Sequence, residues 1–236
     1  MVAVIVRSGK GRTIDFRVSE RLCLVKVGRN VSARKLRKAL YPFGEGYIFS
    51  EQFDSSFKAY FTPFDHRSLE EHLLFNAFLK TASFKNFNKV GVVCTNTITP
   101  TRAAELLRFI SELIIIDPIT DEQFLHNCIK QYGTCPDFGT YRDLYSCDAV
   151  LSFDGIKNYN GLHFGTGGVT VCGDSLPLPY YTTAALAHGT DPLKLLSLLN
   201  AETGGNYHNL TPQIITYNGQ KIPLDAFLER KEKILL

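Results

Sequence analysis

The sequence predicts an α/β protein: a mostly parallel sheet with helices on both faces, preceded by a small α+β N-terminal unit and followed by a C-terminal β-hairpin. Two observations predict this fold. From residue 89 onward, short segments that are apolar throughout alternate with amphipathic segments of helical period, as in buried parallel strands joined by helices. Near the end of the chain, two β-prone arms flank Asn218-Gly219, a strong hairpin signal. We expect the three parts to span residues 1–66, 67–210 and 211–236.

The N-terminal unit is predicted from three apolar or alternating strands and one short amphipathic helix. The strands are expected at Val2–Arg7, Thr13–Val18 and Leu22–Val27, with the sequence "SGKG" as a turn between the first two. Ser32 is a suitable N-cap for a helix that ends near "YPFGEG", where proline and glycine stop it. Residues 47–50 are expected to form a further short strand.

The middle of the chain is predicted to contain four buried strands. They are expected at residues 90–94, 113–116, 149–153 and 168–173. Thr99 is the expected N-cap of the helix after the first of these strands, with Pro100 at its first position, where the missing N–H costs nothing. The strand order of doubly wound sheets places the first strand centrally, with the second on one side and the third on the other.

The run from "VGVVCTN" through "TRAAELLRFISELIIIDP" to "YRDLYSCDAVLSFDG" resembles a Rossmann-type dehydrogenase domain. The resemblance covers about residues 89–174, and it implies a dinucleotide-binding fold with NAD(P) as the cofactor. Asp117 ends the second strand, 22 residues beyond Thr95, close to the spacing of the carboxylate that binds a ribose hydroxyl. An Asp-Pro pair is also a common turn initiator, which is the structural alternative for Asp117. The sequence departs from the pattern in one respect, because the turn after the first strand lacks the G-x-G-x-x-G glycines.

The turn between the first strand and its helix is the first candidate ligand site. A helix N-terminus directs free N–H groups and the positive end of its dipole at such a turn, which suits an anion. Without glycine the backbone cannot approach a pyrophosphate closely. We therefore expect a small anionic ligand, with Thr101 as the least encumbered hydroxyl donor, and no adenine dinucleotide. The candidate ligand-binding residues are Thr95, Asn96, Thr97, Thr99, Thr101, Asp117 and Asp154.

A glycine-rich stretch at residues 154–168 is the second candidate. It follows the third strand, at the edge where α/β proteins bind ligands, and it holds His163, a weak candidate for a catalytic proton donor. Its glycines precede a strand, whereas a phosphate cradle leads into a helix, so we expect a flexible loop or hairpin here. The sequence contains neither a G-x-S-x-G nor a Walker motif.

Neither a metal site nor a nucleic-acid site is indicated. The six cysteines never reach C-x-x-C spacing, and the six histidines form no H-E-x-x-H pair. Residues 1–40 hold 11 Lys and Arg against 2 Asp and Glu, but these cations lie on the solvent sides of the predicted elements without interleaved aromatic rings. This basic face favours solvent or a protein partner over nucleic acid.

The apolar runs are short. The first ends after five residues and none approaches 18, so we expect no signal peptide, no membrane span and a cytoplasmic protein with reduced thiols. The leading hypothesis is a Rossmann-like protein whose crevice holds a small ligand or is vestigial, without a complete dehydrogenase site. One alternative is an NAD(P)-dependent oxidoreductase with a glycine-free phosphate turn. The other is a non-enzymatic interaction module that uses the basic N-terminal face, and a homo-oligomer is compatible with it.

Overall fold

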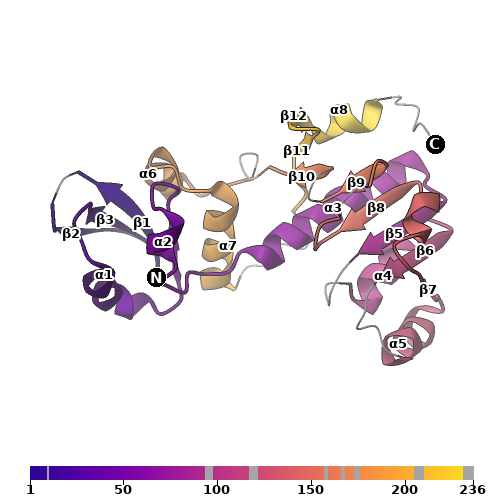
Figure 1. Ribbon diagram of the computed structural model, residues 1–236, viewed down its shortest axis with the longest axis horizontal. Coiled ribbons are helices and arrows are strands. Elements are labelled where there is room, and N and C mark those ends of the chain that lie inside the picture. The colour runs from indigo at the N-terminus through magenta and orange to yellow at the C-terminus, as the bar shows by residue number, and fades with distance from the viewer. Residues whose placement is uncertain are drawn as a thin grey trace. The chain divides into compact units, whose positions relative to one another are not determined.

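The chain forms two compact units, each made of two separate segments. The first unit contains residues 1–70 and 173–209, and the second contains residues 71–172 and 210–236. This division differs from the three consecutive parts expected from the sequence, because two helices after residue 180 pack onto the first sheet and the C-terminal hairpin extends the second. The computed structural model (Figure 1) describes residues 1–9, 11–93, 98–116, 122–156, 159–165, 168–172, 176–204 and 210–230.

The first unit is built on a four-stranded sheet of order β2-β3-β1-β4. Strand β1 is parallel to β3 and β4, whereas β2 is antiparallel to β3. The strands are β1 (Val2–Ser8), β2 (Ile14–Ser19), β3 (Leu22–Gly28) and β4 (Tyr47–Phe49). All four match the strands expected from the sequence to within one residue at each end.

Helices cover both faces of this sheet. Side chains of α1 pack with Ala3, Ile5 and Val25 on one face, and side chains of α6 and α7 pack on the other. As expected, Ser32 caps α1, its hydroxyl accepting from the Lys35 amide at 3.3 Å. The helices of the unit are α1 (Ala33–Leu40), η1 (Tyr41–Phe43), α2 (Ser55–Lys58), η4 (Tyr180–Thr182), α6 (Thr183–Ala187) and α7 (Pro192–Thr203).

The second unit contains an eight-stranded sheet of order β12-β11-β10-β9-β8-β5-β6-β7. The six strands from β7 to β10 in this order are parallel, and β11 and β12 add an antiparallel hairpin. The strands are β5 (Lys89–Val93), β6 (Glu112–Ile116), β7 (Asp137–Phe138), β8 (Ala149–Ser152), β9 (Leu162–Phe164), β10 (Val169–Val171), β11 (Ile214–Tyr217) and β12 (Gln220–Pro223). The central β5 between parallel β6 and β8 confirms the predicted order, which is that of a Rossmann-type sheet.

The chain crosses the two faces of this sheet in turn. Apolar side chains of α3, α4, α5 and α8 form one core with Val90, Val92 and Leu151. The return from β7 to β8 covers the opposite face, where Leu144 of η2 packs on Val150. Right-handed crossovers in opposite directions from β5 place their connections on opposite faces, so the predicted layers are confirmed. The helices are α3 (Arg67–Lys85), α4 (Pro100–Leu106), α5 (Glu122–Tyr132), η2 (Asp143–Ser146) and α8 (Leu224–Glu229).

The C-terminal hairpin is also confirmed. Asn218 and Gly219 lie between β11 and β12 with φ angles of 48° and 78°. Two consecutive positive φ angles define the tight turn whose twist matches a hairpin, and asparagine followed by glycine adopts them at the lowest cost.

Candidate functional site

Part of the first candidate site lies outside the described residues. The carboxyl ends of β5 and β6 are described to Val93 and Ile116, and α4 is described from its cap onward. The expected ligand-binding residues that fall outside the described ranges are Thr95, Asn96, Thr97 and Asp117. The described residues of the site are Thr99, Thr101, Asp154 and His163.

The two described threonines of the turn already have hydrogen-bond partners. The Thr99 hydroxyl accepts from the Arg102 amide at 3.2 Å and caps α4, as the sequence predicts. The Thr101 hydroxyl lies 2.8 Å from the Tyr132 hydroxyl at the end of α5. This contact links α4 to α5, and the expected donation of Thr101 to an anion stays a prediction. The helix itself has only seven residues.

Replacing Thr101 by Ala, or Tyr132 by Phe, is expected to lower the free energy of unfolding by about 0.5–1 kcal/mol each, because each change removes the same hydrogen bond. The two hydroxyls are directly coupled, so the double variant should lose less than the sum of the two single losses. Urea unfolding of the four proteins measures this coupling. Strictly additive losses would assign the two hydroxyls independent roles.

Arg102 is a cation near the carboxyl edge that the sequence does not single out. Its guanidinium lies 5.2 Å from the ring centre of Phe75 and 5.9 Å from that of Phe153. Burial lowers the pKa of Arg102, while the charges of Glu71 and Glu105 raise it. Aromatic faces and carboxylates therefore already surround this charge, which indicates a structural role.

His163 belongs to a strand and not to the loop or hairpin expected at residues 154–168. It lies in β9, which pairs parallel with β8, so that His163 is opposite Val150 and Phe164 is opposite Leu151. The stretch forms a strand because its centre, "LHF", is buried beside apolar β8. The other predicted residue of this stretch, Asp154, is exposed and lies two residues beyond the end of β8.

His163 and Ser152 share one face of the sheet at the carboxyl end of its central strands. Ser152, the last residue of β8, lies opposite Val93 of β5. Residues 150 and 152 point to the same face because strand side chains alternate, and His163 pairs with residue 150. The side chains of Ser152 and His163 are 1% and 4% exposed. Both residues lie beside the carboxyl ends of β5 and β8, where the connections that follow the two strands run in opposite directions. Open α/β sheets bind ligands at this position.

Within the described part of the chain, neither Ser152 Oγ nor His163 Nε2 has a hydrogen-bond partner. Leaving a buried donor or acceptor unpaired costs about 1–3 kcal/mol. Single buried hydroxyls in the same condition occur elsewhere in the described residues, but Ser152 and His163 lie on neighbouring strands and the same face. Those other hydroxyls belong to Ser50, Thr134, Thr190 and Ser197.

Gly165 lies close to the Ser152 backbone and to the His163 ring. Its φ angle is +133°, and a Cβ at this position would lie 2.2 Å from the Ser152 carbonyl oxygen and 3.3 Å from His163 Nε2. No other residue type therefore fits here without displacing the end of β8.

Burial raises the pKa values of two groups near His163, Tyr159 and Cys147. Burial raises the pKa of Tyr159 to about 12, and burial raises the pKa of the Cys147 thiol to about 11. The ring of Tyr159 meets that of His163 edge-on at 6.1 Å, and its hydroxyl donates to the Cys147 carbonyl at 3.4 Å. A protonated thiol is a poor nucleophile, and Ser152 has no hydrogen bond to a base, so these residues do not form a nucleophile–base pair.

Burial lowers the pKa of His163 below its ordinary value of 6.5. In the unfolded chain this imidazole takes up a proton at a higher pH than in the folded protein, so protonation favours unfolding. We therefore expect stability to be complete above pH 6.5 and to fall as the pH drops from 6.5 through the lower folded-state pKa. Urea unfolding between about pH 5 and 8 should show this slope, and His163→Phe should reduce it. Identical slopes in both proteins would remove His163 as the cause.

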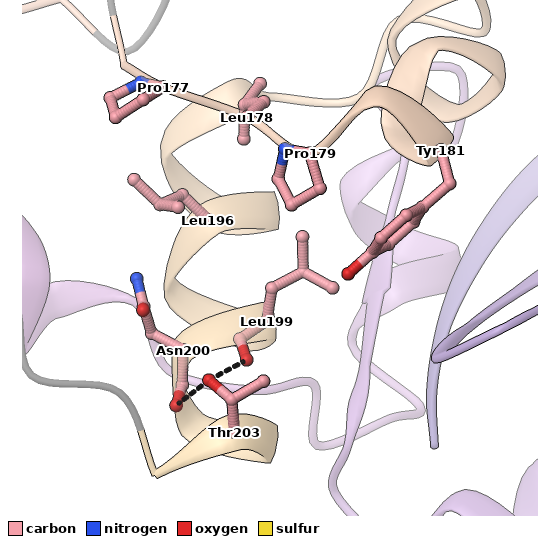
Figure 2. Close-up of a pocket in the computed structure, with 8 residues that line it drawn as sticks. All are labelled: Pro177, Leu178, Pro179, Tyr181, Leu196, Leu199, Asn200 and Thr203. Carbon is pink, nitrogen blue, oxygen red and sulfur yellow. Dashed lines mark hydrogen bonds between the residues drawn. The ribbon is translucent and has the colours of Figure 1, made fainter.

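The first unit has a pocket of its own, of about 360 Å³. It lies between α7 and the segment that precedes η4, and Figure 2 shows Tyr181 and Asn200 on opposite sides of Leu199. The hydroxyl of Thr203 is bonded to the carbonyls of Leu199 and Asn200 at 3.1 and 3.3 Å. Most of the lining is apolar: Pro177, Leu178, Pro179, Tyr181, Leu196 and Leu199, with Asn200 and Thr203. This pocket offers contact area but few directional groups.

Among the described residues no three or more His, Cys, Asp or Glu side chains gather as a metal ion would require. No helix in the described ranges combines the length and the apolar composition needed to cross a bilayer.

Comparison with known proteins finds distant likeness in structure but no match in sequence. No protein-family model matches the chain, and no curated protein matches it. Among solved structures, L-tryptophan dehydrogenase from Nostoc punctiforme aligns with a TM-score of 0.36 and 12% sequence identity, over 78% of this chain and 63% of the dehydrogenase. This chain thus spans less than two thirds of that protein's length, and a likeness this low has no bearing on function.

The sequence did not point to Ser152. Ser152 lies in a segment whose pattern predicts a continuous apolar strand, and a single serine in such a strand is usually a tolerated core residue. A polar residue at the last position of such a strand, at the carboxyl edge, is the one signal that indicates it.

Proposed function

We propose that the second unit binds a small polar ligand at the carboxyl ends of β5, β8 and β9, and that it lacks a complete dehydrogenase site. The observation that carries this proposal is the pair of buried, unpartnered atoms Ser152 Oγ and His163 Nε2 beside Gly165. A ligand that hydrogen-bonds both atoms removes the cost of burying them unpaired. Their place at the switch point of the strand order is where open α/β sheets bind ligands.

The surroundings favour an uncharged ligand group. Nε2 of a neutral imidazole either donates or accepts one hydrogen bond, and a hydroxyl can donate and accept, so a hydroxyl or amide group of the ligand is complementary to both. An anion finds less support here, because burial lowers the pKa of His163 and the Thr101 hydroxyl already contacts that of Tyr132. The expected small anionic ligand is therefore the less favoured form of the proposal.

A second candidate function is that of an NAD(P)-dependent oxidoreductase. The specific observation in its favour is the parallel order β7-β6-β5-β8-β9-β10, which is the strand order of dinucleotide-binding sheets. Against it are the glycine-free turn and the lack of a catalytic pair around His163. We further propose a cytoplasmic location, which the free thiols of Cys23, Cys128, Cys135 and Cys147 support.

Calorimetric titration with two sets of compounds separates the candidates. One set contains small neutral polyols, amides and nucleosides; the other contains NAD(H), NADP(H) and S-adenosylmethionine. We expect a neutral compound to bind and Ser152→Ala to weaken its binding by about tenfold, as loss of one hydrogen bond does. His163→Phe should have a similar effect.

The matched control is Ser50→Ala, which removes an equally buried and unpartnered hydroxyl from the first unit. It should leave the affinity unchanged. Saturation by a dinucleotide below about 100 μM would favour the second candidate. If neither set binds at millimolar concentration, the crevice is vestigial and the proposal fails.

A further inference from the structure

Strand β2 forms an open edge of the first sheet. It is last in the order β2-β3-β1-β4, and five of its six residues are exposed. Two of them are large apolar residues: Phe16 is 47% exposed and Val18 is 62% exposed. Open edge strands with apolar side chains invite pairing with another strand, and most proteins cover or shorten them.

Part of the β2 backbone faces away from β3, toward this edge. The Gly28 amide donates to the Thr13 carbonyl at 3.0 Å, so Thr13 directs its polar backbone groups toward β3. Backbone direction alternates along an antiparallel strand, so residues 15, 17 and 19 also face β3. The N–H and C=O groups of Ile14, Phe16 and Val18 therefore point outward at the open edge. The opposite edge differs, because the Tyr47 carbonyl of β4 accepts from the Phe64 amide at 2.9 Å.

The sequence of this edge is complementary to itself. In an antiparallel pair of two β2 strands centred on Phe16, residues 14 and 18 face each other, and so do residues 15 and 17. Asp15 of each copy then lies opposite Arg17 of the other. Lys26 of β3 lies on the other side of Asp15, so the charges alternate in sign across the joined sheet. Opposite charges at directly facing positions stabilise strand pairing.

The same register joins the apolar side chains. Ile14, Phe16 and Val18 share the face of Val25 and Val27, where α1 packs. In the centred register the two Phe16 rings meet at the two-fold axis, and Ile14 of each copy faces Val18 of the other. The outward N–H and C=O groups of these residues are those that an antiparallel partner bonds. Polar groups, charges and apolar contacts therefore agree on one register.

We propose that β2 is a dimerisation edge, at which two copies of this chain pair antiparallel about Phe16 and join their four-stranded sheets. The partner is a second copy and not an unrelated peptide, because the complementary positions occur in the same strand. A two-fold axis through Phe16 makes each contact occur twice, as in any isologous interface. This inference concerns the first unit and is independent of the ligand proposed for the second.

Charge reversal tests the partner. The single variants Asp15→Arg and Arg17→Asp place like charges opposite each other in a homodimer, and each should weaken dimerisation by at least about tenfold. Mixed in equal amounts, the two variants place Arg opposite Asp at both positions, so a heterodimer should form. Sedimentation velocity measures the masses of the species. The salt concentration should be about 0.15 M, because repulsion between charges more than about 8 Å apart is then largely screened. Circular dichroism and thermal melting confirm that each variant is folded.

Disulfide cross-linking tests the register. Facing residues that exchange backbone hydrogen bonds have Cα atoms about 5.5 Å apart, within the range that a disulfide spans. In a Cys135→Ser background, which removes the native thiol that is exposed among the described cysteines, Phe16→Cys should therefore form a covalent dimer under mild oxidation. Val18→Cys is the matched control, because its two copies would lie roughly 13 Å apart.

Three results would overturn the proposal. The first is a wild-type protein that stays monomeric up to about 100 μM, a range that reveals most specific dimers. The second is a pair of charge variants that dimerise as well as the wild type. The third is cross-linking of Val18→Cys as efficient as that of Phe16→Cys, which would assign the contact to another register or surface.

Discussion

Gly165→Ala is expected to destabilise the protein by roughly 2–5 kcal/mol and to abolish ligand binding in the second unit. The methyl group would lie 2.2 Å from the Ser152 carbonyl oxygen, and the φ angle of +133° is one that L-residues rarely adopt. Both terms act on the backbone, which cannot rotate away as a flexible side chain can. Because the displaced group belongs to Ser152, the change should reach the proposed site directly.

Gly133→Ala is the matched control for this substitution. Gly133 also has a positive φ angle, +66°, but a Cβ there would meet nothing within 4 Å. Gly133→Ala should therefore lower the free energy of unfolding by only about 1–2 kcal/mol, which is the cost of the left-handed backbone conformation alone. Urea unfolding of both variants measures the difference. Equal losses would mean that the end of β8 moves freely to accommodate the methyl group.

Phe78→Ala is expected to lower the free energy of unfolding by about 3–5 kcal/mol. The Phe78 ring is fully buried on α3, and its centre lies 5.0 Å from that of Phe164 and 6.3 Å from that of Phe87. Removing it leaves a cavity where the helix packs on the sheet. The loss should also reach β9, because Phe164 follows His163 directly in that strand.

Phe84→Ala in the same helix provides the comparison. Phe84 is 59% exposed, so its truncation removes little buried area and should change stability by less than about 0.5 kcal/mol. Thermal or urea unfolding separates the two variants. Similar losses would contradict the assignment of Phe78 to the centre of the core of the second unit.

The elements and the sheet order were predictable because they depend on local patterns. Continuous apolar strands between amphipathic helices indicate a parallel sheet, and β6 and β8 flank β5 as predicted. Caps and turns are local as well: Thr99 and Asp191 accept hydrogen bonds from the first amides of α4 and α7, and Asn218-Gly219 forms the hairpin turn. Each depends on residues within a few positions of one another.

The candidate site was predictable only in part. The sequence predicted a ligand site at the carboxyl edge of the sheet and named His163 as a candidate residue. It also predicted that His163 lies in a loop, and it gave no reason to single out Ser152. The hydrogen bond between the hydroxyls of Thr101 and Tyr132 was not predicted, because the two residues are 31 positions apart in the sequence. Hydrogen bonds between distant residues leave no periodic signal in a single sequence.

By itself, the sequence determined the α/β class, most of the strands, the places of β6 and β8 on either side of β5, and the hairpin, since these follow from side-chain periodicity and local backbone preference. It did not determine β9, whose residues were expected in a loop or hairpin. The tertiary structure alone decided which polar atoms are buried without partners, that residues after 180 return to the first sheet, and that β2 is left at its edge. The physical reason is that burial and strand pairing depend on which distant segments meet. Ser152 is an ordinary strand serine until β5 and β9 enclose it. Phe16 is an ordinary apolar strand residue until β2 becomes the edge strand of its sheet, paired with β3 on one side only.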